Sequence, residues 1–239
     1  MMQSTEQFER DGYCLIAGVF DATAMADAVR ATTTLLAGND TSVLKGSSSP
    51  AYGARNLLQL WPASVQLLQL PRLQALLGSL LGLRGGVVRV LYFDKPPGHS
   101  WALPWHRDQT IAVKVHRDST VFMKPTMKAG VPHVEAPRSL LETMVTVRIH
   151  LDPMWLENGA LRVVPGSHRN LQTPATQDAR TIECSAGDVL LMRPLLLHAS
   201  GHSEVTTALH RRIVHLECAM SSELPDGFEW HDFVSITPC

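Results

Sequence analysis

The stretch Trp101-Ala102-Leu103-Pro104-Trp105-His106-Arg107-Asp108-Gln109-Thr110 decides the fold. It places His106 and Asp108 one residue apart, just before the apolar run Ile111-Ala112-Val113. On a β-strand, residues i and i+2 face the same way, so an imidazole and a carboxylate can be presented to one point. With a second, distant histidine, such a pair makes a 2-His-1-carboxylate metal site.

The same His-x-Asp pattern occurs twice more, at His116/Asp118 and at His150/Asp152. His116 lacks both the Pro-Trp lead and the Lys-Pro-Pro-Gly segment found upstream of His106, so we interpret it as part of a solvated turn. Asp152 opens a Leu-Asp-Pro turn and is interpreted as structural. The context therefore favours the first of the three pairs.

The composition is that of a globular protein and excludes several classes of protein. Of 239 residues, 45% are hydrophobic and 18% charged, with a net charge of −1, so there is no basic field for nucleic acid. No run of about 18 apolar residues predicts a membrane span, and no signal peptide is visible. The four cysteines are scattered, which indicates reduced thiols and a cytoplasmic protein.

Helical patterns come first along the chain and β patterns follow. Helices are predicted over 4–10, 21–38, 62–70 and 71–82, and strands over 13–20, 87–94, 110–116, 143–151, 160–164, 180–184, 188–192, 195–199 and 211–218. This order favours an α+β fold with a mainly β core, a sandwich or barrel.

We expect a single domain over 1–239, with residues 1–84 as mostly helical support and 85–239 as the β core. Segment 39–55 is rich in Ser, Gly, Asn, Asp and Pro, and segment 117–142 reads as an irregular insertion rich in Met, Pro and Lys. Either is a candidate lid over a site.

A second histidine, His198, ends the apolar run 190–197 about 90 residues after His106. Alone, such a histidine is more often a satisfied core residue than a ligand. However, Arg211 and Arg212 open a strand about a dozen residues later, and a guanidinium there can hold a carboxylate through two hydrogen bonds.

Short motifs follow one another along nearly the whole chain. They are Phe8-x-x-Asp11-Gly12-Tyr13, Lys95-Pro96-Pro97-Gly98, Trp105-His106-x-Asp108, Leu151-Asp152, Glu157-Asn158-Gly159-Ala160-Leu161, Pro165-Gly166-Ser167-His168, Ala186-Gly187-Asp188, His198-x-Ser200-Gly201 and Arg211-Arg212. Each is weak alone, but their ordered set resembles the phytanoyl-CoA dioxygenase family of Fe(II)/2-oxoglutarate oxygenases.

This resemblance implies a double-stranded β-helix, or jelly roll, with N-terminal helices buttressing one sheet. It implies that His106, Asp108 and His198 bind iron and that 2-oxoglutarate and O2 are cosubstrates. The implied reaction hydroxylates an unactivated C–H bond of a small molecule and releases succinate and CO2. Relatives that halogenate lack the carboxylate, so Asp108 favours hydroxylation.

The resemblance assigns one arginine of the last core strand to the distal carboxylate of 2-oxoglutarate. Family members usually place it nearer the distal histidine than Arg211 or Arg212 stands here. Neighbouring strand residues face opposite ways, so one arginine points inward. We favour Arg211, because a polar residue and then an apolar run follow it. Ser200 and Arg148 are further candidates for the cosubstrate site, Arg148 also for an acidic substrate.

His133 and Trp105 are weaker candidates for substrate contacts, with a surface role and a packing role as their alternatives. Two other functions stay open. A cupin-like metal enzyme would use no 2-oxoglutarate and would need no arginine after His198. A non-catalytic jelly-roll binding protein would tolerate loss of a ligand, whereas all three are present. Substrate identity and oligomeric state do not follow from the sequence.

Overall fold

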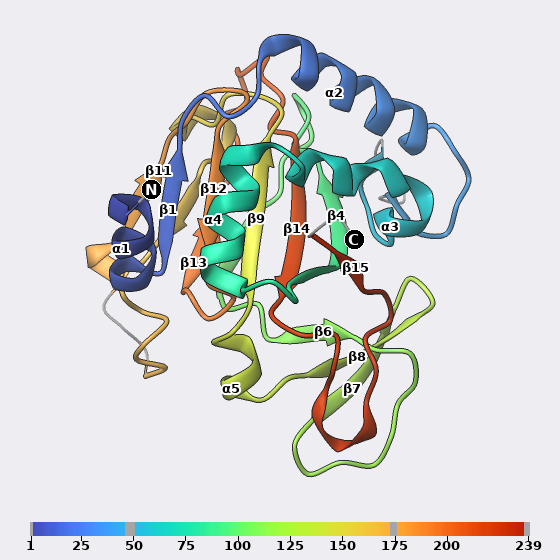
Figure 1. Ribbon diagram of the computed structural model, residues 1–239. Coiled ribbons are helices and arrows are strands. Elements are labelled where there is room, and N and C mark those ends of the chain that lie inside the picture. The colour runs from blue at the N-terminus through green and yellow to red at the C-terminus, as the bar shows by residue number, and fades with distance from the viewer. Residues whose placement is uncertain (1, 46–50, 173–175, 237–239) are drawn as a thin grey trace.

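The computed structural model describes residues 2–45, 51–172 and 176–236 (Figure 1). Its helices are α1 (Met2–Asp11), α2 (Ala22–Leu36), α3 (Leu57–Leu60), α4 (Pro71–Leu81) and α5 (Arg138–Leu141). Short 3-10 helices are η1 (Pro62–Leu68), η2 (Leu156–Asn158), η3 (Thr176–Asp178) and η4 (Pro225–Gly227). The helices predicted over 4–10, 21–38 and 71–82 are confirmed, while the zone 62–70 is a 3-10 helix preceded by α3.

The strands form antiparallel sheets. They are β1 (Tyr13–Ile16), β2 (Val43–Lys45), β3 (Ala51–Ala54), β4 (Gly86–Phe93), β5 (Leu103–His106), β6 (Thr110–Ala112), β7 (Met123–Lys128), β8 (Val131–Glu135), β9 (Val145–His150), β10 (Leu161–Val163), β11 (Arg180–Ile182), β12 (Val189–Met192), β13 (His198–Ser200), β14 (Ile213–Ala219) and β15 (Val234–Ser235). The predicted α+β class is confirmed.

Within the described residues, a major sheet runs β1-β12-β9-β14-β4-β3-β2, with β15 also paired to β4. A minor sheet runs β11-β10-β13-β5, and a third, smaller one runs β6-β8-β7. Several neighbours in the major sheet are far apart in sequence, as β9 between β12 and β14 illustrates. Such non-local antiparallel order is typical of a jelly roll.

The two faces of the major sheet have different chemistry because side chains alternate along each strand. On β9, Val145, Val147 and Ile149 pack into the large hydrophobic core beneath the helices. The residues between them, Arg148 among them, face the opposite side, where Arg148 lines a cavity. The strand therefore separates a hydrophobic layer from a polar interior.

Helices α2 and α4 lie against the outer face of the major sheet (Figure 1). Asp21 caps α2 by accepting a hydrogen bond from the Ala24 backbone at 2.8 Å. Helix α4 begins with Pro71 and buries a leucine stripe at positions 73, 76, 77, 80 and 81. The helical support expected from the N-terminal third is therefore built against this sheet.

The expectation of an irregular segment at 117–142 is wrong. Strands β7 and β8 form a hairpin there, joined by Ala129-Gly130 and paired to β6. The sequence does not reveal this hairpin, because five of the six β7 residues are exposed and no apolar alternation marks the strand. In the other expected loop, 39–55, strands β2 and β3 form, and residues 46–50 lie outside the described part.

Among the described residues, no helix is both long and apolar enough to cross a membrane. Cys14, Cys184 and Cys218 are free and buried, whereas Cys239 lies outside the described residues.

Candidate metal centre

Two histidines meet across the minor sheet. His106 ends β5, and it pairs in register with His198, the first residue of β13. Their ring centroids are 4.2 Å apart. His106 Nε2 lies 3.9 Å from Asp108 Oδ1, and His198 Nε2 lies 3.7 Å from Asp108 Oδ2. The donor atoms of the three residues all lie within 4.8 Å of one another, a spacing that suits one metal ion.

Backbone carbonyls fix both imidazoles. Nδ1 of His106 lies 2.7 Å from the Pro104 carbonyl oxygen, and Nδ1 of His198 lies 2.8 Å from that of Leu196. A carbonyl accepts only, so each Nδ1 must carry the proton and each Nε2 presents its lone pair to the centre. Burial lowers the pKa of His198 to about 4, which keeps that ring neutral and able to bind a metal.

Asp108 follows β5 rather than lying on a strand, and its backbone N–H donates to the Pro194 carbonyl at 2.9 Å. The pairing of β5 with β13 thus replaces the simple i, i+2 geometry expected from sequence. Burial alone raises the pKa of this carboxyl, but His198, His215 and His106 lower it to about 2. Its Oδ2 is buried without a hydrogen-bond partner, as befits an oxygen that binds a cation.

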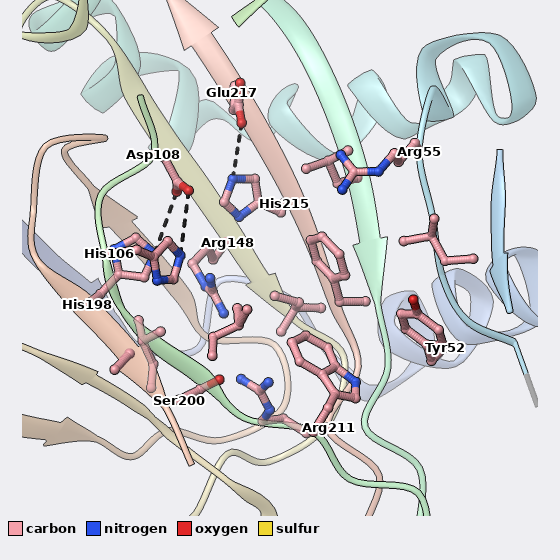
Figure 2. A pocket seen from close by; sticks show the side chains of 18 of the residues that line it. Tyr52, Arg55, His106, Asp108, Arg148, His198, Ser200, Arg211, His215 and Glu217 are labelled. Atoms are coloured by element: carbon pink, nitrogen blue, oxygen red, sulfur yellow. Dashed lines mark ion pairs between the residues drawn. The ribbon is translucent and has the colours of Figure 1, made fainter. Parts of the chain in front are cut away.

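The three residues open into a cavity of about 630 Å³ between the major and minor sheets (Figure 2). Its polar lining includes Arg55, Arg89, His106, Asp108, Lys128, Arg148, His198, Ser200, Arg211, His215 and Glu217. Aromatic and aliphatic side chains complete the wall: Leu44, Tyr52, Leu91, Phe93, Trp101, Leu103, Leu161 and Ile213. A volume of this size lies within the range of small-molecule binding sites.

Arg211 and Arg212 have opposite environments. Arg212 makes two hydrogen bonds to Asp152, at 2.6 and 2.7 Å, so its charge is neutralised and Asp152 is structural as expected. Arg211 is buried and lines the cavity, and in the described residues its one recorded side-chain partner is the Met154 sulfur at 4.0 Å. A buried guanidinium without a carboxylate is costly unless an anion binds it.

Arg148 is the second cation of this kind. It is buried on β9 and lies between Asp108 and Arg211 in Figure 2, and no hydrogen bond or ion pair is found for its side chain among the described residues. Burial and mutual repulsion lower the pKa of Arg211 to about 9, and burial lowers that of Arg148 to about 10. Both arginines are cationic at neutral pH, and their surroundings fit a dicarboxylate.

Ser200 lies two residues beyond His198 on β13, and its side chain lines the cavity. Its hydroxyl accepts a hydrogen bond from Lys95 Nζ at 3.1 Å, and the same Nζ donates to the Gly201 carbonyl at 2.6 Å. Lys95 is fully buried. It belongs to the Lys-Pro-Pro-Gly motif, but the sequence does not predict its contacts with Ser200 and Gly201. Burial and the two nearby arginines lower its pKa to about 6.

The weaker sequence candidates lie outside the cavity lining. His133 is buried on β8, where Nδ1 bonds to the Val131 carbonyl at 2.9 Å. Trp105 is half-buried, and the Cζ atom of the Arg162 guanidinium lies 5.4 Å from the centroid of the Trp105 ring. His116 is exposed. Sequence reasoning missed the lining cations Arg55, Arg89 and Lys128, because segments that carry no chemical motif supply them.

The two facing sheets and the His-x-Asp…His constellation define the class of Fe(II)/2-oxoglutarate oxygenases with a double-stranded β-helix. The chain belongs to the phytanoyl-CoA dioxygenase (PhyH) family, whose model matches residues 8–212. The match spans every sequence motif from Phe8 to Arg212, so the expected family is confirmed.

Two relatives match about a third of this chain in sequence. Uncharacterized proteins of Mycobacterium tuberculosis and Mycobacterium bovis are each 31% identical over 88 residues, which is 34% of this chain. The matched segment spans about a third of the length of these relatives, 32% in each case.

Solved structures share the fold. EctD from S. alaskensis with bound Fe has a TM-score of 0.70 at 20% identity, covering 94% of this chain and 82% of EctD. The same protein with 2-oxoglutarate and 5-hydroxyectoine has a TM-score of 0.72 at 19% identity, covering 93% and 76%. The non-heme alpha ketoglutarate dependent epimerase SnoN from nogalamycin biosynthesis has a TM-score of 0.66 at 20% identity, covering 95% and 90%. The expected double-stranded β-helix is confirmed.

Proposed function

We propose that this chain is an Fe(II)- and 2-oxoglutarate-dependent dioxygenase that hydroxylates an unactivated C–H bond of a small molecule and releases succinate and CO2. It acts as one domain over 1–239. The observation that carries the proposal is the presence, in one cavity, of a three-donor metal set and a buried arginine without a carboxylate partner among the described residues.

Each member of the site has a role in this proposal. His106, Asp108 and His198 hold Fe(II), which when bound supplies the redox chemistry that couples O2 to oxidation of 2-oxoglutarate. Arg211 binds the distal carboxylate through two hydrogen bonds, and Ser200 donates its hydroxyl proton to the same group. Arg148 lies between Asp108 at the metal centre and Arg211, and its positive charge offsets the negative charge of the bound cosubstrate.

The surrounding cavity positions the substrate relative to the metal centre. The three donor residues would hold the metal at one side of the cavity, and the aromatic wall would let a substrate carbon approach from the rest of it. Asp108 supplies a carboxylate ligand, which supports hydroxylation over halogenation. The free thiols Cys14, Cys184 and Cys218 support a cytoplasmic location.

Two identical His-Arg-Asp tripeptides offer a matched test of the ligand set. We expect His106→Ala to lower Fe(II) binding strongly in anaerobic equilibrium dialysis and to abolish succinate formation from 2-oxoglutarate. His116→Ala should bind iron as the native chain does, because His116 is exposed and is not a member of the three-donor group. Loss of iron only in the His116 variant would show that the metal set is wrongly assigned.

The cupin-like alternative makes a different prediction. Iron would bind, but O2 consumption would proceed without succinate formation, and replacing Arg211 would not matter. A non-catalytic binding protein would bind neither Fe(II) nor 2-oxoglutarate in a way that supports a reaction. The buried arginines favour the 2-oxoglutarate enzyme, because the alternatives leave their charge without a ligand.

A further inference from the structure

A second group of cations lines the cavity, and the proposed function does not use it. Arg55, Arg89 and Lys128 belong to this group. Apart from Asp108 at the metal centre, Glu217 is the one carboxylate among the described lining residues. Three positive charges, all on half-buried side chains, therefore face one negative charge.

Arg89 and Glu217 neutralise each other. Arg89 Nε donates to Glu217 Oε2 at 2.9 Å, and Nη2 donates to Oε1 of the same carboxylate and to the Thr110 carbonyl. Both side chains are nearly buried, so this paired arrangement is rigid. Glu217 is thereby held by Arg89, and His215 Nε2 also lies 3.6 Å from its Oε1, so this one carboxylate offsets the charges of Arg55 and Lys128 only in part.

Arg55 and Lys128 retain free donors. No hydrogen bond or ion pair is found for the Arg55 guanidinium in the described part of the chain, and Lys128 Nζ donates one hydrogen bond, to Thr110 Oγ1 at 2.9 Å. Burial lowers the pKa of each, and repulsion by Arg89 lowers both further. An oxyanion bound between them would relieve this repulsion.

The backbone brings the two cations together from distant parts of the chain. Arg55 directly follows β3, and the next residue, Asn56, has a positive φ of 55°. The Asn56 side chain donates to the Ala129 carbonyl at 3.1 Å, and Ala129 is the neighbour of Lys128 in the hairpin turn. Asn56 thus ties the end of β3 to the β7–β8 hairpin.

This pair is separate from the arginine of the proposed 2-oxoglutarate site. In Figure 2, Arg55 and Arg211 lie on different sides of the cavity, with His106 and His198 at a third. Different charges act on the two arginines: Arg89 and Glu217 on Arg55, but Arg148 and Asp94 on Arg211. The two arginines therefore belong to different charge environments within one cavity.

An aromatic surface extends along the cavity from Tyr52, which acts on the charge of Arg55, to Trp101, whose ring centroid lies 4.8 Å from Lys95 Nζ. The Trp101 ring centroid is 6.2 Å from that of Tyr52 and 6.1 Å from that of Phe93, and all three line the cavity. Rings in contact at these distances form a continuous apolar wall. A ligand in this part of the cavity therefore meets cations at one end and an apolar surface along its side.

We propose that the substrate is a small molecule with an oxyanion group, a carboxylate or a phosphate, bound by Arg55 and Lys128. Its apolar body packs on Tyr52, Phe93 and Trp101, which directs a C–H bond toward the metal centre. This proposal rests on the proposed function for the reaction, but the anion site itself is a property of the cavity.

The test uses matched probes and the metal-free protein. Calorimetry would compare phenylacetate, phenyl phosphate and the neutral phenylacetamide. We expect at least one anion to bind roughly tenfold or more tightly than the amide, since hydrogen bonds to charged groups are the strong ones. Arg55→Gln and Lys128→Gln should each remove that preference, whereas Lys124→Gln, on the same hairpin but exposed and paired with Glu135, should keep it.

Failure of this proposal and failure of the proposed function give different results. The Arg55 and Lys128 variants should still bind 2-oxoglutarate with Fe(II), while Arg211→Gln should lose 2-oxoglutarate and keep the anion preference. The anion site is disproved if both glutamine variants bind the anions as the native chain does. If the anions bind only by competing with 2-oxoglutarate, they occupy the site at Arg211, and this result would also overturn the proposed anion site.

Discussion

At the scale of single residues, the partner of each charge distinguishes structural from functional groups. The sequence could predict that Arg211 and Arg212 face opposite ways, because alternation is a property of strands. It could not predict which one is neutralised. Asp152, 60 residues away, forms an ion pair with Arg212, whereas Arg211 lines the cavity.

This difference predicts opposite effects of two similar substitutions on stability. Arg212→Met should lower the free energy of unfolding by about 2 kcal/mol, because Asp152 loses its partner; the pair is 21% and 14% exposed, so the loss is below that of a fully buried pair. Arg211→Met should raise it by about 1 kcal/mol in the metal-free protein, because a buried unpaired charge is removed. Urea unfolding of both variants measures this, and destabilisation by Arg211→Met would contradict it.

Lys95 predicts a pH dependence of stability. Its pKa is about 6 in the folded chain, against 10.5 for an ordinary lysine, so above pH 6 the unfolded chain binds one proton more. Stability should therefore rise with pH between 6 and 10.5, by up to about 1.4 kcal/mol per pH unit from this group.

Replacement of Lys95 by Met should remove that contribution to the slope, whereas Lys124→Met, on an exposed side chain, should leave the slope unchanged. The measurement is urea unfolding of the metal-free protein at several pH values from 6.5 to 9, a range within the window set by these pKa values. Equal slopes for native chain and Lys95 variant would mean that Lys95 stays charged when buried.

At the scale of elements, strands with regular alternation were predictable and exposed strands were not. Strand β14 alternates Val214 and Leu216 toward the core with His215 and Glu217 toward the cavity, a clear period of two. Strand β7 is almost wholly exposed, so its hairpin was missed, and with it the contribution of Lys128 to the cavity. The meeting of Arg55 and Lys128 depends on tertiary contacts that no local pattern encodes.

The β7–β8 turn carries a testable strain. Ala129 and Gly130 have φ values of 48° and 77°, the left-handed region that suits glycine better than alanine. Ala129→Gly should raise the free energy of unfolding by about 1 kcal/mol, since the methyl group disfavours this conformation. Gly130→Ala should lower it by a similar amount, and a destabilised Ala129→Gly variant would contradict the account.

At the scale of the whole molecule, helices, the major sheet and the minor sheet are held by adjoining hydrophobic clusters. Cys14 and Cys218 lie in the cluster beneath the helices, and Cys184 lies in another, which contains minor-sheet residues. Burial raises the pKa of Cys14 and Cys184 to about 12 and that of Cys218 also. These thiols therefore report on opening of different layers.

In a Cys239→Ser background, the three thiols should react with iodoacetamide only as the whole chain unfolds, and at one common rate. Peptide mass spectrometry after timed labelling measures each rate. Rapid labelling of Cys184 with protection of the other two would show that the minor sheet opens independently of the major sheet.

The central claim is that one cavity binds both iron and 2-oxoglutarate, through His106, Asp108, His198 and Arg211. Anaerobic titration of the metal-free protein with Fe(II), then 2-oxoglutarate, tests it most directly, by the visible charge-transfer band of the chelate. We predict a band in the native chain and in His116→Ala, and none in Arg211→Gln at the same concentrations. A chain that binds iron without a band, or an Arg211 variant that keeps it, would contradict the claim.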